Sequence, residues 1–451
     1  MANLIKRILA LSVAIIFGSF TNFFAQDSTH IKVSRMIDSV SMQNLQSHIR
    51  ILENAWGYQS RVNLTPGSDS AAQWIKRELE KFPSLQVELD TFFISSAQAP
   101  FNTKPLFNVV ATIRGTVDDY VILGAHYDAS ASRMGTTVWQ NQWATIKAPG
   151  ADDNATGVAA LLEIARAFSD PQNNFRPYYT IKLIAFGAEE AGVIYTGNHH
   201  GSVNIARKAK LRGDRIVGMI SLDMIGYNPL HLYTAIVANT QSEWIGRVFR
   251  NMNVNFNLGL LTNAPPFPYA NYSDHHSFVL EGYSAILIIE NAPPWNNGPY
   301  YTANPYYHTS ADSSGTLNMN LVRKVTQLSL ASVAFMSAVT DINEEDENFV
   351  LKDFFLYQNY PNPFNPSTVI NYNVPVASRV NITVYDLLGR QVAILVDEVK
   401  QAGKYETKFN AIDNEFQSLS SGLYFYRLNA QQLDAGESSN FTVTKKMMLM
   451  R

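Results

Sequence analysis

The chain has 451 residues, 35 basic and 38 acidic, with a net charge of −3 and no cysteine. This length allows two or more domains with separate cores. The nearly balanced charge gives no electrostatic basis for binding nucleic acid. The absence of cysteine excludes disulfides and thiolate metal sites, and it leaves the cellular compartment open.

The first 25 residues follow the pattern of a secretory signal peptide. Lys6 and Arg7 precede the apolar run Ile8–Phe17, and a polar stretch then leads to Ala25. The run is shorter than the roughly 18 apolar residues that a membrane-spanning helix needs. We therefore predict a signal peptide over residues 1–25, followed by an exported protein with no stable membrane span.

Residues 26–340 alternate between strand patterns and helix patterns. Helical spacing of apolar residues occurs within residues 26–60, 71–81, 157–168 and 317–339. Strand patterns cover Val87–Ile94, Phe107–Ile113, Tyr120–Ala125, Tyr179–Phe186, Ile216–Leu222, Leu232–Ala238 and Ala285–Ile289. This alternation predicts one domain over residues 26–340, an α/β/α sandwich with a mixed, largely parallel sheet.

The composition changes after residue 340. Residues 341–351 form a short acidic segment, which we interpret as a linker. Short β-like runs separated by turn residues follow at nearly even spacing as far as Met447. They predict a small all-β, immunoglobulin-like sandwich over residues 352–451.

The polar motif APGADDNATG, residues 148–157, lies at the centre of the first domain. It places the adjacent carboxylates Asp152 and Asp153 on a glycine-bounded turn before a helix. Four further motifs end strands or occupy loops: GAHYD (124–128), FGAEEAG (186–192), SLDMIG (221–226) and YHTSAD (307–312). Ligand sites of such sheets lie at strand ends. Together the motifs offer enough histidines and carboxylates to bind a pair of divalent metals.

A hydrolytic site with two metals needs a bridging carboxylate, further ligands and a general base that is not itself coordinated. Asp153 suits the bridging position, and Asp128 can orient the imidazole of His126 as a hydrogen-bond acceptor. Asp223 and His308 complete the two coordination spheres. The adjacent Glu189 and Glu190 cannot point the same way, so one can ligate while the other holds the nucleophilic water.

In order and over residues 105–340, these five motifs resemble the co-catalytic dizinc aminopeptidases of the leucyl aminopeptidase and glutamate carboxypeptidase type. The resemblance implies two zinc ions per chain and hydrolysis of N-terminal residues from peptides. It also implies a cis peptide bond between Asp153 and Asn154. It assigns roles to six residues: Asp153 bridges the zinc ions, Glu190 and His308 bind one, His126 and Asp223 bind the other, and Glu189 is the general base and later the proton donor.

The segment YANYSDHHSF, residues 269–278, resembles the pocket loop of the same family. We expect a pocket for a hydrophobic N-terminal side chain, with the candidate residues Tyr272, Asp274, His275, Phe278 and Tyr307. Further candidates for its wall are Pro265–Pro268, Trp295, Tyr300, Tyr301 and Tyr306. Core packing is an alternative use for each aromatic residue. We expect Trp139 and Trp143 to pack locally, and His199 and His200 to lie at the surface.

The C-terminal part resembles a type IX secretion sorting domain. The resemblance rests on LYQNYPNPFNPSTVINYNV (356–374), VYDLLGRQVAILV (384–396), SGLYFYRL (421–428) and the basic end KKMMLMR (445–451). It implies that the type IX secretion machinery exports the protein across the inner and outer membranes, to the cell surface or the medium. A sandwich that binds carbohydrate or protein is the alternative.

Three other functions remain open for the first domain. A glutaminyl cyclase has the same fold and much of the same constellation but uses a single zinc. A carboxypeptidase acting on acidic substrates would want basic pocket residues, and residues 265–308 contain no arginine or lysine. A metal-free binding module at the cell surface is the third alternative, and it would leave the five candidate ligands without a purpose.

Overall fold

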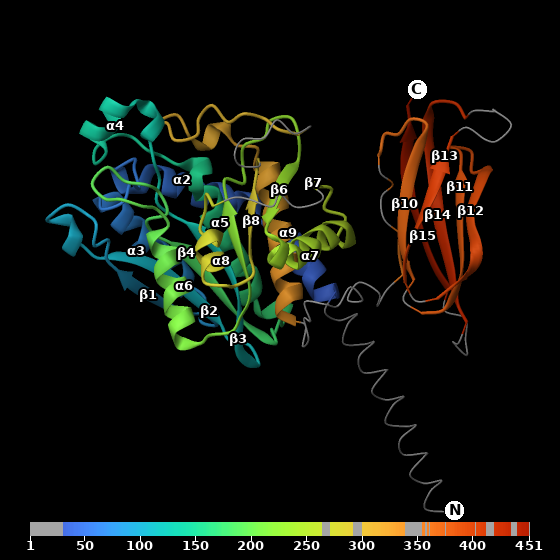
Figure 1. The fold of residues 1–451 in the computed structure, drawn as a ribbon, viewed down its shortest axis with the longest axis horizontal. Coiled ribbons are helices and arrows are strands. Elements are labelled where there is room, and N and C mark those ends of the chain that lie inside the picture. Colours follow the sequence, from blue (N-terminus) through green and yellow to red (C-terminus); the bar gives the residue numbers. More distant parts are fainter. Residues whose placement is uncertain are drawn as a thin grey trace, which may run out of the picture. The chain divides into compact units, whose positions relative to one another are not determined.

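The computed structural model describes residues 30–263, 271–291 and 300–338 in the N-terminal part, and 354–356, 359, 361–374, 376–401, 403–411, 419–433 and 440–450 in the C-terminal part. The predicted signal peptide and acidic linker lie outside these residues. The chain divides into two compact units between Asp341 and Ile342, and Figure 1 shows an α/β unit and an all-β unit.

The first unit is built on one eight-stranded sheet with the strand order β1-β2-β4-β3-β5-β8-β6-β7. Four of its neighbouring pairs are parallel: β4 with β3, β3 with β5, β5 with β8, and β6 with β7. The strands are β1 (Gln86–Phe92), β2 (Leu106–Ile113), β3 (Val117–His126), β4 (Tyr179–Phe186), β5 (Ile216–Asp223), β6 (Tyr233–Ala238), β7 (Leu261–Thr262) and β8 (Ala285–Ile289).

Helices cover both faces of the sheet (Figure 1). On one face α5 (Thr156–Ser169) and α9 (Met319–Ala338) pack against the central strands, with α2 (Met42–Asn54), α3 (Pro66–Glu80) and α7 (Glu243–Asn255) beside them. On the other face lie α6 (His200–Arg212) and α8 (His275–Leu280), while α4 (Thr136–Gln142) belongs to the long loop after β3. Residues 30–38 form a further helix. The predicted α/β/α sandwich with a mixed, largely parallel sheet is therefore confirmed.

Helix α5 explains why the run after the central acidic motif is so apolar. Nearly all of its residues are buried, because the helix is enclosed between the sheet and the neighbouring helices α2 and α9. At its start, a Cβ on Gly157 would lie only 2.7 Å from the carbonyl oxygen of Leu222. Glycine thus allows the turn before α5 to lie directly against the end of β5.

The neighbouring strands β4, β3 and β5 run parallel, so their carboxyl ends meet at one edge of the sheet. His126 is the last residue of β3 and Asp223 the last residue of β5. Glu189 and Glu190 follow within four residues of the end of β4. This topology brings three separated motifs to the same edge.

The second unit consists of two antiparallel sheets, β13-β10-β9 and β12-β11-β14-β15. Its strands are β9 (Phe355–Leu356), β10 (Ser367–Val374), β11 (Ser378–Tyr385), β12 (Gln391–Lys400), β13 (Gly403–Asn410), β14 (Gly422–Gln432) and β15 (Asn440–Leu449). Side chains from both sheets, including Ile370 and Tyr426, share one buried core, as in a β-sandwich. None of the helices within the described ranges is long and apolar enough to span a membrane.

Candidate metal centre

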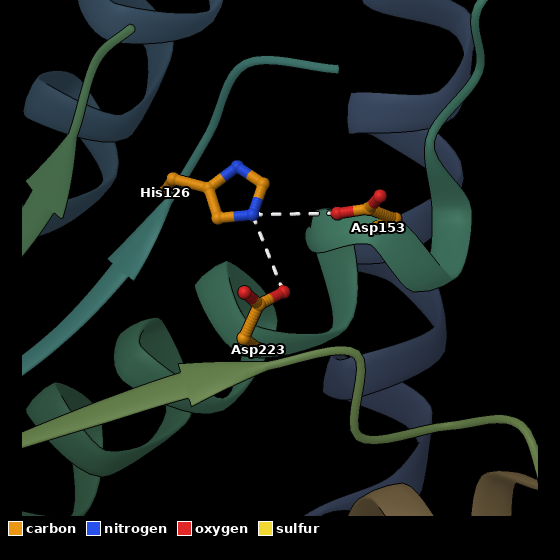
Figure 2. Close-up of side chains that lie close together, drawn as sticks. All are labelled: His126, Asp153 and Asp223. Atoms are coloured by element: carbon orange, nitrogen blue, oxygen red, sulfur yellow. Dashed lines mark hydrogen bonds and ion pairs between the residues drawn. The ribbon is translucent and has the colours of Figure 1, made fainter. Parts of the chain in front are cut away.

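The first group of candidate ligands joins the ends of two strands to the turn before α5. His126 Nε2 lies 3.3 Å from Asp153 Oδ1 and 3.3 Å from Asp223 Oδ1. Figure 2 shows the imidazole of His126 directed at both carboxylates. All three side chains are buried, and their nearest ligand atoms lie within 4.8 Å of one another. The three residues are therefore arranged to hold one metal ion.

The second group uses the other oxygen of the same aspartate. His308 Nε2 lies 3.0 Å from Asp153 Oδ2 and 2.8 Å from Glu190 Oε1. The ligand atoms of these three residues also lie within 4.8 Å of one another. Asp153 thus directs Oδ1 at one group and Oδ2 at the other. A carboxylate in this position can bridge two metal ions.

The pKa values of the candidate ligands show how strongly their charges interact. Burial opposes ionisation of Asp153, but hydrogen bonds with His126 and His308 outweigh it and hold the pKa of Asp153 well below its ordinary value. Burial disfavours the charged imidazole of His308, yet Glu190 and Asp153 raise its pKa to about 10. Burial also raises the pKa of Glu190, to about 8. Positive charge that faces these carboxylates comes from the imidazoles and from the buried guanidinium of Arg61.

One buried atom supports a metal at the second group. Glu190 Oε1 is close to His308 Nε2 but makes no hydrogen bond within the described residues. The two atoms form an ion pair at 2.8 Å in the metal-free site, and a metal ion bound by both could take the place of that contact. Imidazole and carboxylate donors are the set that zinc accepts, so the residues present fit that metal.

Asp128 faces His126, in keeping with the predicted role, and also contacts the turn after β4. His126 Nδ1 lies 3.2 Å from the backbone carbonyl of Asp128 and 3.6 Å from its carboxylate, so the nearer acceptor is the carbonyl. The carboxylate instead accepts the backbone N–H groups of Glu189, at 3.1 Å, and Glu190, at 2.9 Å. Asn63 donates a further hydrogen bond to it at 2.6 Å. Asp128 therefore fixes the turn that carries both glutamates.

Asp312 fixes the turn that carries the bridging aspartate. Its two carboxylate oxygens accept the backbone N–H groups of Asp152, at 2.9 Å, and Asp153, at 3.1 Å. The peptide bond between Asp153 and Asn154 is cis, in agreement with the resemblance. The Asn154 side chain donates to the Leu222 carbonyl at 2.8 Å. The turn is thereby attached to the end of β5, beside Asp223.

Sequence analysis assigned no role to Asp312 or to the residues that surround Asp152. The Asp152 carboxylate accepts hydrogen bonds from the backbone N–H of Gly226 and from Asn304, both at 2.9 Å. Asn304 also donates to Glu290 at 3.3 Å. Asp152 thus belongs to a buried network behind the site and joins neither ligand group. Asp312 lies inside the quoted motif YHTSAD, which is the signal that could have identified it.

The residues expected in the substrate pocket have different environments. Tyr272 is exposed, Asp274 and His275 are buried, and Tyr307 stacks on the ligand candidate His308 with ring centroids 3.8 Å apart. Phe278 is fully buried in a core cluster with Phe186. Its predicted place in the pocket wall is wrong, because that face of α8 packs on the sheet. Pro265–Pro268 and Trp295 lie outside the described residues.

Other aromatic residues expected near the pocket pack against the protein. Tyr300 and Tyr306 contact Tyr233 and Tyr227, with ring centroids 5.6 Å and 5.8 Å apart. Trp139 and Trp143 border a cavity of about 10 Å³ beside Glu190, which has room for about one water. Both tryptophans pack against the buried cluster around Ala131 and Ile146, so they pack locally, as expected.

The two adjacent histidines also differ from the expectation. His199 is buried, so its predicted surface location is wrong, and its Nε2 lies 3.0 Å from Glu189 Oε1. His200 is partly exposed and contacts the ring of Tyr195. No metal-ligand spacing marks His199, so the sequence carried no signal for its position.

Comparisons with known proteins agree with this architecture. The model of peptidase family M28 matches residues 108–333, half of the chain, and the model of the secretion system C-terminal sorting domain matches residues 358–445. A probable leucine aminopeptidase of Arthroderma otae is 25% identical over 300 residues, which cover 64% of this chain and 70% of the relative.

Two solved structures show the same fold. The zinc aminopeptidase BSAP of Bacillus subtilis has a TM-score of 0.51 and 16% identity, and the match covers 68% of this chain and 98% of that one. A glutaminyl cyclase of an Acidobacteriales bacterium has a TM-score of 0.51 and 19% identity, covering 66% of this chain and 95% of that one. The chain therefore belongs to peptidase family M28 and ends in a secretion system C-terminal sorting domain.

Proposed function

We propose that this protein is an exported aminopeptidase that works with two zinc ions and removes N-terminal, preferentially hydrophobic residues from peptides. One observation carries the proposal: the two oxygens of Asp153 face two separate histidine–carboxylate groups. A site for a single metal does not need both oxygens of one buried aspartate directed at different ligand groups. Likeness to a zinc aminopeptidase and to a leucine aminopeptidase supports the choice of metal and reaction.

In this proposal His126 and Asp223 hold one zinc ion, and Glu190 and His308 hold the other. Asp153 would offer one carboxylate oxygen to each ion. Ser132 supports the arrangement, because its hydroxyl lies 3.0 Å from His308 Nδ1. A partner on the outer nitrogen keeps the ring oriented and leaves Nε2 for the metal.

Bound zinc supplies a nucleophilic water of lowered pKa and polarises the scissile carbonyl. Glu189 is the general base: it accepts the proton that the attacking water gives up and returns it to the leaving amine. Its carboxyl is buried, and burial raises its pKa well above the ordinary value. A raised pKa suits a group that first takes and then donates a proton near neutral pH.

Selection for N-terminal residues follows from charge and shape. We expect the free α-amine of a peptide to lie beside the metal centre, which favours the N-terminal residue over internal ones. Tyr272, Asp274, His275 and Tyr307 remain our candidates for contacts with the N-terminal side chain. No arginine or lysine occurs in residues 265–308, which argues against a site for acidic side chains.

The sorting domain supports export by the type IX machinery. We propose that residues 1–25 direct passage across the inner membrane and that residues 352–451 direct passage across the outer membrane. The enzyme then acts at the cell surface or in the medium, and the C-terminal unit takes no part in catalysis.

The test uses the full chain, stripped with a chelator and titrated with zinc. Release of p-nitroaniline from leucyl-p-nitroanilide and cyclisation of an N-terminal glutaminyl peptide are followed against bound zinc. We expect leucine release to rise to a plateau near two zinc ions per chain. Cyclisation that saturates near one zinc, without amine release, would assign the protein to the glutaminyl cyclases. No zinc binding at all would favour a non-catalytic surface module.

A further inference from the structure

We propose that His199 is a positioning residue that holds the catalytic Glu189 in its working orientation. The proposal rests on the role of Glu189 as general base given above. His199 Nε2 lies 3.0 Å from Glu189 Oε1, and both side chains are buried. The pairing lies outside the two metal-ligand groups.

The backbone attaches His199 to the same turn. The N–H of His199 donates to the carbonyl of Glu189 at 2.8 Å, and the N–H of His200 donates to that of Ala188 at 2.7 Å. The next residue, Gly201, donates to the carbonyl of Gly187 at 3.1 Å. The start of α6 is therefore paired with the segment that carries Glu189, and the imidazole is held beside the carboxylate at both backbone and side chain.

The chemistry of the imidazole makes it a hydrogen-bond donor. Burial lowers the pKa of His199 against the opposing charge of Asp274, so the ring is neutral near pH 7 and carries one N–H. With that proton on Nε2, the ring donates to the carboxylate of Glu189. Asn198 Nδ2 lies 3.1 Å from the same nitrogen. Donation from Nε2 to Glu189 therefore requires the exposed Asn198 amide to turn its oxygen, in place of its nitrogen, toward Nε2.

A hydrogen bond to Oε1 of Glu189 helps to explain why Glu189 stays uncoordinated beside Glu190. Glu189 and Glu190 have the same side chain at the same strand end, yet one must ligate metal and the other must stay uncoordinated. A hydrogen bond at Oε1 turns that oxygen of Glu189 toward α6 and leaves Oε2 for proton transfer. Without it, Oε1 would be a buried acceptor with no partner, and the carboxylate would rotate to find one.

The first measurement compares three variants of the full chain loaded with zinc, using leucyl-p-nitroanilide. For His199→Ala we expect kcat to fall about 10²-fold, as for a misplaced catalytic group, with KM within about threefold and zinc content unchanged. His199→Gln keeps a donor at similar reach, so it should recover at least about tenfold of that loss. His200→Ala is the matched control and should behave as wild type.

The second measurement does not depend on turnover. In protein labelled with ¹⁵N-histidine, wild-type His199 should show the Nε2–H tautomer, and Glu189→Gln should shift its ring resonances but leave those of His200 unchanged. An Nδ1–H tautomer, or resonances insensitive to Glu189→Gln, would overturn the proposal. So would a kcat within threefold of wild type in His199→Ala, or equal losses in the alanine and glutamine variants.

The two measurements also separate this inference from the proposed function. A wild-type protein that releases no leucine rejects the aminopeptidase, whatever the histidine variants do. If His199→Ala loses zinc or fails to fold, the kcat of His199→Gln and the ring resonances of His199 test the positioning role instead. A selective loss of kcat in an active, dizinc protein supports the positioning role.

Discussion

The guanidinium of Arg61 donates from Nη2 to the carbonyl oxygen of Gly150 at 2.8 Å. It also donates from Nε to the carbonyl of Tyr127 at 2.7 Å, and from Nη1 to those of Leu52 and Pro149 at 2.8 and 2.5 Å. Tyr127 follows the candidate ligand His126, and Gly150 begins the turn that carries Asp153. One buried cation thus connects the N-terminal segment to two parts of the metal centre.

Replacing Arg61 with methionine should destabilise the first unit. The carbonyls of Leu52, Pro149 and Gly150 would lose their donor, and a buried acceptor without a partner costs about 1–3 kcal/mol. We expect the free energy of unfolding to fall by about 3 kcal/mol or more. All six tryptophans precede residue 342, so tryptophan fluorescence during urea unfolding reports this unit alone. Arg77→Met, at an exposed position of α3, is the control, and equal midpoints for the two variants would refute the expectation.

Replacing Asp312 with asparagine should weaken zinc binding without removing a ligand. The side-chain amide has one acceptor oxygen where the carboxylate has two, so the N–H of Asp152 or of Asp153 loses its partner. Loss of a group that orients a ligand typically reduces metal affinity 10–100-fold. Competition with a fluorescent zinc chelator measures this change. Asp118→Asn, whose side chain is almost fully exposed, should leave the affinity unchanged.

Much of the α/β unit was predictable from local patterns. The seven predicted strands all occur, with ends that differ by a few residues, because buried strands appear as continuous apolar runs and the half-exposed β1 as an alternating one. The grouping of His126, Asp223 and the glutamates follows from topology, since β4, β3 and β5 are neighbours and parallel. Motifs at the carboxyl ends of such strands must converge.

The residues that sequence analysis missed act through long-range contacts with no periodic pattern. Arg61 and Asp312 contact the backbone of distant turns, and backbone acceptors and donors exist at every residue. His199 was interpreted as a surface residue because nothing in the sequence shows that α6 starts beside Glu189. The resemblance of residues 269–278 to a pocket loop places Phe278 in the pocket, and the sequence of a helix as short as α8 does not show which face meets the sheet.

Replacing Glu189 with glutamine should lower kcat strongly and preserve the metal centre. The amide cannot accept the proton of the attacking water, and a general base contributes about 10²–10⁴-fold to the rate. We expect kcat to fall by this factor, while zinc measured by atomic absorption stays at the wild-type content. Glu190→Gln is the matched variant and should lose zinc. The opposite pattern, with zinc lost from Glu189→Gln and kept in Glu190→Gln, would show that the two roles are reversed.

Zinc binding at pH 7 should release protons, because the metal-free site holds them. The carboxylates of Glu190 and Asp153 outweigh burial and raise the pKa of His308 to about 10, so its imidazole is protonated until zinc arrives. Ligation needs a neutral Nε2, and the proton must leave. Apparent affinity should therefore keep rising with pH toward about 10, where an ordinary histidine would level off near its pKa of about 6.5. Isothermal titration calorimetry at pH 7, in two buffers with different ionisation enthalpies, counts the protons from the difference in observed heat. Heat that does not depend on the buffer would mean that no proton leaves when zinc binds, so that both His308 and Glu190 are already deprotonated in the metal-free site.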